Sequence, residues 1–192
     1  MTRVRDPVKL AQLIVRVVSR VVQVQHASLF LWDKQTESCR LVASEGPKQF
    51  SLESRYVLES GHPLIRLLQE SKRILNQDEL SVPQDALADQ ELKNLSAAMI
   101  VPGFIENELI GFLVLGEKLS KASYSVDDIH AFSTLANEAA VALENARSYE
   151  ALLKVNEQLR LAHDRLLQQE RFAAAGQFAT GMAHEIKNPL SA

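Results

Sequence analysis

Residues 109–115 read Leu109-Ile110-Gly111-Phe112-Leu113-Val114-Leu115, a run that is apolar on both of its alternating faces. A strand of this kind must be covered on both sides, so we expect it near the middle of its sheet. Another apolar run, residues 97–105, comes just before it, and the polar segment 106–108 separates the two. Together they predict an antiparallel hairpin.

The N-terminal third of the chain predicts a helix and then a second hairpin. Apolar residues recur at helical spacing in the first segment: Leu10, Leu13, Ile14, Val17, Val18 and Val21. The apolar runs 27–32 and 39–43 follow, joined by the polar stretch 33–38, and Gly46-Pro47 marks a turn. Between the two hairpins we expect a short helix starting near Pro63 and short strands at 55–58 and 74–75. Residues 77–95 fit either a short helix or an irregular loop.

The last part of the chain predicts a long helix. Ser125 is a good N-cap, and Asp128 stands three residues later, as in a capping box. No proline occurs between residues 126 and 187. Apolar residues follow coiled-coil spacing: Leu135, Ala139, Ala142, Ala146, Tyr149, then Leu152, Val155, Leu159, Ala162 and Leu166. The spacing slips after Tyr149 and again before Phe172. Such slips fit either a tolerated imperfection of a dimer seam or two packing registers of similar energy.

The order of these elements resembles that of the GAF domain family. The resemblance covers residues 6 to about 147 and depends most on 108–115, on Tyr124-Ser125 and on Leu135-Ala136-Asn137-Glu138-Ala139-Ala140. It implies an α+β fold, in which an antiparallel sheet is flanked by helices and followed by a long C-terminal coiled-coil helix. It further implies a homodimer and a pocket for a small molecule near residues 44–95, with a ligand that the sequence does not identify.

A second resemblance lies near the C-terminus. The string His184-Glu185-Ile186-Lys187-Asn188-Pro189-Leu190, preceded by Gly176, Ala179, Gly181, Met182 and Ala183, resembles the phosphoacceptor motif of the HisKA histidine-kinase family. A neutral imidazole is a competent nucleophile near pH 7. The resemblance implies that His184 accepts the phosphoryl group of ATP, with Mg, and passes it to an aspartate of a response regulator. In this family, the position of Glu185 assists the imidazole, and that of Asn188 helps arrange the phosphoryl group.

These resemblances divide the chain into three parts. Residues 1–147 are expected to form a GAF-like sensory domain, 148–169 a coiled-coil signalling linker, and 170–192 the first part of a dimerisation and phosphoacceptor domain. The sequence contains no glycine-rich nucleotide motif and ends just after the histidine motif. We therefore expect a longer full-length protein to be the active protein-histidine kinase and this chain to be inactive alone.

Composition limits the remaining possibilities. The net charge is -3 and no basic block occurs, which argues against nucleic-acid binding. Arg16 and Arg20 interrupt the most apolar stretch, so no transmembrane segment is predicted. Cys39 is the only cysteine, which excludes an internal disulfide and fits a cytoplasmic location. The histidines lack the spacing of metal ligands.

Two alternatives remain open. The first is a non-enzymatic dimeric GAF module that binds a ligand or relays a signal. The second is a cofactor-bearing redox or gas sensor, in which His62 is the available haem ligand, although a histidine before a proline at a helix start is more often a capping residue.

Overall fold

The computed structural model describes residues 6–47, 56–76 and 86–187, and for residues 173–187 it describes the helical backbone alone. The chain divides into two units, Met1–Arg147 and Ser148–Ala192. The first is an α+β domain. The second consists, where described, of the later part of one helix.

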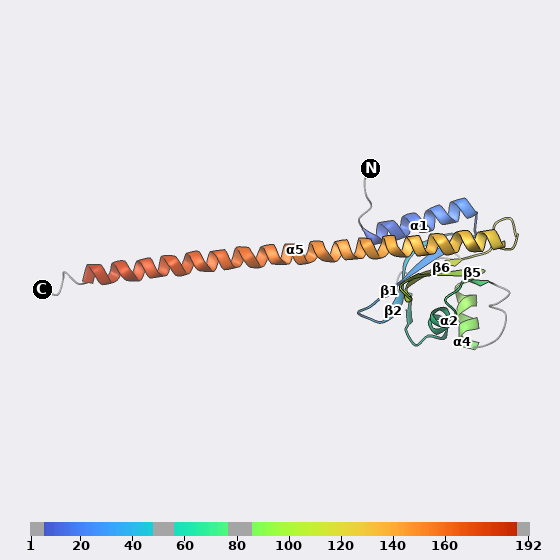
Figure 1. Cartoon of the computed structure of the whole chain (residues 1–192), viewed down its shortest axis with the longest axis horizontal. Helices are drawn as coiled ribbons and strands as arrows, with labels where there is room; N and C mark the ends of the chain where they lie inside the picture. Colours follow the sequence, from blue (N-terminus) through green and yellow to red (C-terminus); the bar gives the residue numbers. More distant parts are fainter. Residues whose placement is uncertain (1–5, 48–55, 77–85, 188–192) are drawn as a thin grey trace. The chain divides into compact units, whose positions relative to one another are not determined.

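The described strands form one sheet in which all neighbours are antiparallel (Figure 1). Their order is β3-β2-β1-β6-β5-β4. The bounds are β1 Ala27–Asp33, β2 Ser38–Glu45, β3 Val57–Glu59, β4 Leu75–Asn76, β5 Met99–Ile105 and β6 Glu108–Leu115. The two hairpins, β1–β2 and β5–β6, meet through the β1–β6 pair, in which Phe30 is opposite Phe112. The doubly apolar run 109–115 therefore belongs to a central strand, as predicted.

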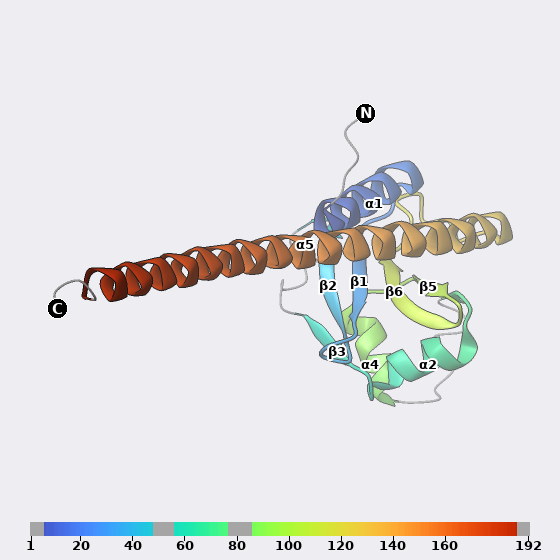
Figure 2. The same ribbon diagram turned by 60° about the vertical axis from the view of Figure 1, so that its left-hand side comes forward.

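Helices cover both faces of this sheet. They are α1 (Pro7–Val22), α2 (Pro63–Ser71), α4 (Ala86–Asn94) and α5 (Val126–Lys187). Figure 2 shows α1 and the first part of α5 on one face, with α2 and α4 on the other. Each face has its own apolar core: residues such as Val15, Leu113 and Phe132 fill the α1–α5 side, and Phe30, Leu64 and Phe112 fill the α2–α4 side.

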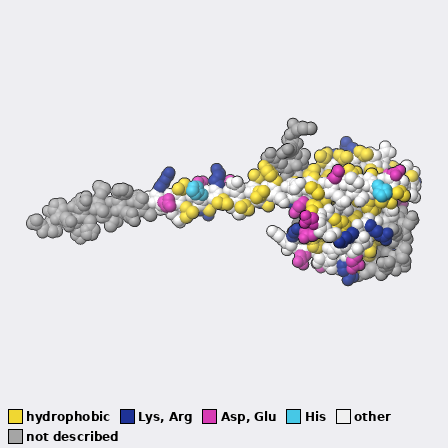
Figure 3. All heavy atoms as spheres, viewed as in Figure 1, with side chains coloured by type: hydrophobic (Ala, Val, Ile, Leu, Met, Phe, Trp, Pro, Cys, Tyr) yellow, Lys and Arg dark blue, Asp and Glu magenta, His cyan; other side chains and the backbone are white. Residues whose placement is uncertain are grey.

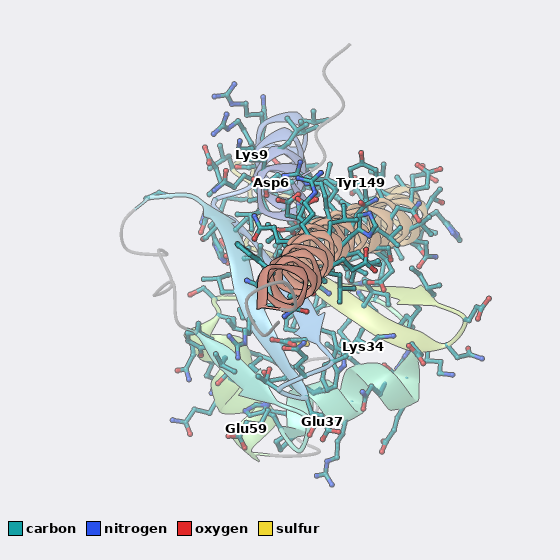
Figure 4. All side chains as sticks on the ribbon, turned by 90° about the vertical axis from the view of Figure 1, so that its left-hand side faces the viewer. Asp6, Lys9, Lys34, Glu37, Glu59 and Tyr149 are labelled. Atoms are coloured by element: carbon teal, nitrogen blue, oxygen red, sulfur yellow. The ribbon has the colours of Figure 1, made fainter. Side chains whose placement is uncertain are left out.

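The helix starts follow from local chemistry. Asp6 caps α1 by accepting hydrogen bonds from the N–H groups of Val8 and Lys9, and Figure 4 shows Asp6 and Lys9 close together. Ser125 and Asp128 form the predicted capping box of α5: Asp128 Oδ2 accepts from Ser125 N at 2.7 Å, and Asp128 N donates to Ser125 Oγ at 3.2 Å. These caps satisfy N–H groups that a helix end leaves without a partner.

Glycine allows α5 to pack closely on the sheet. A Cβ atom on Gly103 of β5 would lie 3.0 Å from the carbonyl oxygen of Ala136 and 3.1 Å from the Cβ of Ala140. Arg147 then ties the end of this packed segment to β1, because its guanidinium donates to the carbonyl of Trp32 at 2.7 Å. Residues 126–147 of α5 are therefore an integral layer of the domain.

The predicted elements are found, with one correction. The stretch 77–95, whose sequence fits either a short helix or an irregular loop, contains α4. The predicted coiled-coil seam is wrong at Ala146, which is 8% exposed because it packs within its own domain. Leu135 and Tyr149 are exposed, as a seam requires. Spacing alone could not show which small residues of α5 face the sheet. None of the described helices is both long and apolar enough to cross a membrane.

Candidate functional site

The predicted phosphoacceptor residues lie at the end of α5. His184 and Glu185 belong to its helical backbone, which continues to Lys187. Their side chains and the whole of Asn188 lie outside the described residues. The roles given to His184, Glu185 and Asn188 therefore stay predictions.

A buried carboxylate organises the α2–α4 side of the domain. Glu91 of α4 is 8% exposed. Its Oε1 accepts a hydrogen bond from the Tyr56 hydroxyl at 2.5 Å, and its Oε2 accepts one from the Asn94 amide at 3.4 Å. His62, at the start of α2, places Nε2 4.0 Å from the same Oε2. A buried carboxylate is tolerated only with such partners, so Glu91 links α2, α4 and the start of β3.

The electrostatics of this cluster favour a structural role. Burial and then the Glu91 hydrogen bond raise the pKa of Tyr56 above its usual value, so the phenol stays protonated as a donor. His62 accepts the N–H of Leu64 through Nδ1 at 3.2 Å and caps α2. The neutral ring therefore carries its proton on Nε2, toward Glu91. His62 is thus the capping residue that its position before Pro63 suggested.

The expected pocket near residues 44–95 would lie against the apolar core on the α2–α4 side of the sheet. Phe30 and Phe112 stack with ring centroids 4.7 Å apart, and Tyr56 contacts the edge of Phe30 with centroids 6.0 Å apart. Segments 48–55 and 77–85 belong to this region and lie outside the described residues. A ligand pocket on the α2–α4 side therefore remains a prediction.

Cys39 is a strand residue, as predicted, and it is fully buried in β2. Burial raises the pKa of its thiol to about 12. A thiol with so high a pKa is almost entirely protonated near pH 7, and the thiolate is the reactive form. Cys39 is therefore a core residue whose thiol stays mostly protonated near pH 7. In the described part of the chain, no three His, Cys, Asp or Glu side chains come together as metal ligands.

His26 is a buried residue that the sequence did not single out. It is 1% exposed, just before β1, and its Nε2 lies 3.0 Å from the carbonyl oxygen of Leu95. Gly46 and Gly116 make room for it, since a Cβ on Gly116 would be 2.3 Å from Nδ1. Burial lowers the pKa of His26, because desolvation penalises the charged ring. A lone histidine in a polar context gave no signal of this burial.

His26 gives the domain a predicted pH dependence. The unfolded state, with its ordinary histidine pKa near 6.5, binds a proton more readily than the folded state. The contribution of neutral His26 to the free energy of unfolding is therefore fully present above pH 6.5. It falls as the pH drops below 6.5, by at most about 1.4 kcal/mol per pH unit. Urea unfolding at pH 7.5 and 5.5 measures this. His26→Gln should flatten the decrease, whereas the exposed His130→Gln should not; equal decreases in both variants would contradict the assignment.

The outer helices carry exposed apolar side chains. On α1, Leu13 and Val17 are 45% and 49% exposed, and on α5 Leu135 is 52% exposed. Figure 3 shows hydrophobic side chains gathered over α1 and the adjoining part of α5. The described part of the second unit is also rich in exposed apolar residues: Leu152, Val155, Leu159, Leu166 and Phe172. Exposed apolar side chains gathered in this way over α1 and the adjoining part of α5 indicate an interaction site.

The fold and a family model together define the class of protein. A family model for the GAF domain matches residues 6–145, so the chain belongs to the GAF domain family. It is a signal-sensing module. The chain is also 32% identical, over 101 residues, to a protein named diguanylate cyclase A from Treponema denticola. That match covers 51% of this chain, and the chain spans only about a quarter (27%) of its relative.

Solved structures show the same fold. The GAF domain/HD domain protein from Geobacter sulfurreducens superposes with a TM-score of 0.61 at 15% identity, covering 74% of this chain and 95% of that one. The blue-light absorbing form of the Thermosynechococcus elongatus PixJ GAF domain has a TM-score of 0.61 at 17% identity, with 82% and 98% covered. At these identities the likeness concerns the fold alone.

Proposed function

We propose that this chain is the sensory and phosphoacceptor region of a two-component histidine kinase. In the full-length protein, ATP with Mg would phosphorylate His184, and the phosphoryl group would pass to an aspartate of a response regulator. The support is the contiguous string from Met182 to Leu190, in which a nucleophile, a neighbouring carboxylate and an amide one turn later stand together. Any one of these residues alone would be an ordinary surface residue.

The fold offers a route from sensor to phosphoacceptor. α5 begins as a packed layer of the GAF domain and is one helix through residues 148–187. A change in the packing of residues 126–147 can therefore act on the same helix that carries His184. In this proposal the sensory domain shifts the population of helix-packing states, and the shift changes access to the phosphoacceptor.

The proposal includes a parallel homodimer. An isolated helix with large exposed apolar residues is marginally stable in water, because most helical stability comes from packing. Leu152, Leu159 and Leu166 are 67%, 66% and 58% exposed in the single chain. A second copy would cover them at coiled-coil spacing, and the two-fold axis would also bring together the apolar surfaces of α1 and α5.

Charge placed in this seam should dissociate the dimer. Leu152→Glu together with Leu159→Glu would set carboxylates against each other in an apolar interface, and we expect the dimer dissociation constant to rise at least about a hundredfold, or about 2.7 kcal/mol. Sedimentation equilibrium at micromolar concentration measures this. Gln158→Glu adds only one of these two charges, at a position beside the seam rather than in it, and should weaken the dimer far less. A wild-type monomer, or a double variant that dimerises normally, would contradict the proposal.

A second candidate function is a cyclase instead of a kinase, and the observation that favours it is the similarity to diguanylate cyclase A. In that case the GAF domain would regulate synthesis of cyclic diguanylate from GTP. A non-enzymatic dimeric relay is the remaining alternative. The kinase and the cyclase make different products and the relay makes neither, so the full-length protein can be given ATP and GTP in separate reactions.

The kinase proposal predicts an acid-labile, alkali-stable phosphoryl group on the protein after incubation with ATP and Mg. Cyclic diguanylate from GTP without such labelling would support the cyclase output instead. Neither product, from a folded dimer, would support the non-enzymatic relay.

A further inference from the structure

A polar cavity lies next to the start of α5. Its volume is about 270 Å³, and it is bounded by the end of β4 and by the loop that joins β6 to α5. Its polar lining consists of Asn76, Glu117, Lys118, Lys121, Ser123 and Tyr124. The apolar cavity between α1, α5 and the sheet measures only about 40 Å³. The polar cavity is therefore the one of these two with room for a small molecule, and it lies apart from the α2–α4 cluster around Glu91.

Two lysines and one carboxylate belong to the lining of this cavity. Lys118 and Lys121 contribute two ammonium groups, and Glu117 contributes one carboxylate. Lys118 Nζ contacts Asp128 Oδ2 at 2.6 Å, and Lys121 Nζ contacts Glu117 Oε2 at 2.8 Å. An ammonium has three N–H donors, which exceeds the one carboxylate contact that each lysine makes among the described residues. Both lysines therefore have N–H donors left for a further oxygen acceptor.

Lys118 is largely buried and held in position by its neighbours. Its side chain is 17% exposed, and its ammonium lies 5.1 Å from the ring centroid of Tyr124. The Tyr124 hydroxyl is itself fixed, since it donates to the carbonyl of Gly116 at 2.6 Å. A partly buried and positioned lysine loses little conformational freedom when it binds an anion.

Asn76 adds a requirement for a hydrogen-bond donor. It lines the cavity, and its Oδ1 is buried without a hydrogen-bond partner among the described residues. A buried acceptor of this kind costs free energy until a donor reaches it. A ligand with an O–H or N–H group beside its anionic group would match both Asn76 and the two lysines.

The cavity wall connects directly to both outer helices. Leu119 N donates to the carbonyl of Gln23, the C-cap of α1, at 2.7 Å, and Gln25 N donates to the carbonyl of Glu117 at 2.8 Å. On the other side, Lys118 holds Asp128, whose carboxylate closes the capping box of α5. Residues 117–121 thus join the end of α1 to the beginning of α5.

We propose that this cavity binds a small oxyanion that also carries a hydrogen-bond donor, and that Lys118 transmits its binding to the start of α5. The ligand class includes hydroxy- and amino-carboxylates and the protonated forms of phosphate. Once bound, the anion shares Lys118 with Asp128 and weakens the ion pair that supports the α5 capping box. The effector would then act at the first turn of the helix that leaves the domain.

Inorganic phosphate at pH 7 tests this directly, because it supplies both an oxyanion and an O–H donor. We would titrate it into the isotope-labelled 192-residue chain and follow amide NMR signals at constant ionic strength, with sodium chloride as the reference salt. We expect saturable shifts at residues 117–124 and at Asp128, with a millimolar dissociation constant. Shifts that grow linearly, or that sodium chloride reproduces, would overturn the proposal.

Matched variants distinguish phosphate binding in this cavity from nonspecific attraction of phosphate to exposed lysines. Lys118→Met should raise the dissociation constant at least tenfold and remove the shift at Asp128. Lys34→Met also removes a lysine ion-paired at 2.8 Å, but at an exposed turn, and should bind phosphate normally. If Lys118→Met fails to fold, Lys121→Met, at a 71% exposed position, keeps the test available and should weaken binding severalfold. Unchanged affinity in the folded lysine variants of the cavity would refute the assignment.

Discussion

Replacing His184 with glutamine in the full-length protein is expected to abolish phosphorylation by ATP. Glutamine keeps the polarity and approximate size of the side chain but has no nucleophilic ring nitrogen, so no N–P bond can form. We expect acid-labile label to fall at least about a hundredfold, to background. Radiolabelled ATP with alkaline work-up measures this loss.

The chain offers a matched control on the same helix. His163 is an exposed histidine of α5 outside the motif. His163→Gln should leave labelling unchanged, which would show that losing a histidine from α5 is harmless in itself. Glu185→Gln should slow labelling without removing it, since a general base contributes about 10²–10⁴-fold. Full labelling of the His184→Gln protein would exclude His184 as the phosphoacceptor.

The largest expected effect on stability comes from Phe30 in the centre of the domain. Phe30 is fully buried in β1 and stacks on Phe112 of β6, so this pair joins the two hairpins. Phe30→Ala removes the buried ring and leaves a cavity, which costs about 3–5 kcal/mol. A domain of ordinary stability would then be close to unfolding. Urea unfolding followed by circular dichroism measures the change.

An exposed phenylalanine provides the control for this prediction. Phe172, on the described part of α5 in the second unit, is 78% exposed. Phe172→Ala should lower the free energy of unfolding of the GAF domain by less than about 0.5 kcal/mol. A similar small loss for Phe30→Ala would mean that the two hairpins are not joined through a packed aromatic centre.

The sequence was most informative where a pattern has one structural solution. The doubly apolar run 109–115 predicted a strand covered on both faces, and it lies beside β1 in the middle of the sheet. Ser125 and Asp128 likewise predicted the start of α5 to the residue, because a capping box depends on local hydrogen bonds. Pro63 predicted the start of α2 for a similar local reason.

The sequence was least informative where long-range contacts decide the outcome. Glu91 belongs to a polar segment, and only the approach of Tyr56 from another element makes its burial tolerable. His26 is buried because Gly46 and Gly116 come close to it in space. Ala146 has seam spacing but is buried within its own chain. The cavity beside Lys118 combines Asn76 with residues some forty positions later, which no local pattern reveals.

The most direct test of the account is to map the phosphorylated residue. The full-length protein would be incubated with ATP and Mg, digested with trypsin under alkaline conditions and analysed by tandem mass spectrometry. Cleavage after Arg171 and Lys187 releases the peptide Phe172–Lys187, in which His184 is the only histidine. The account predicts a phosphoryl group on His184 of this peptide. An unmodified peptide, or phosphorylation at a different residue, would contradict it.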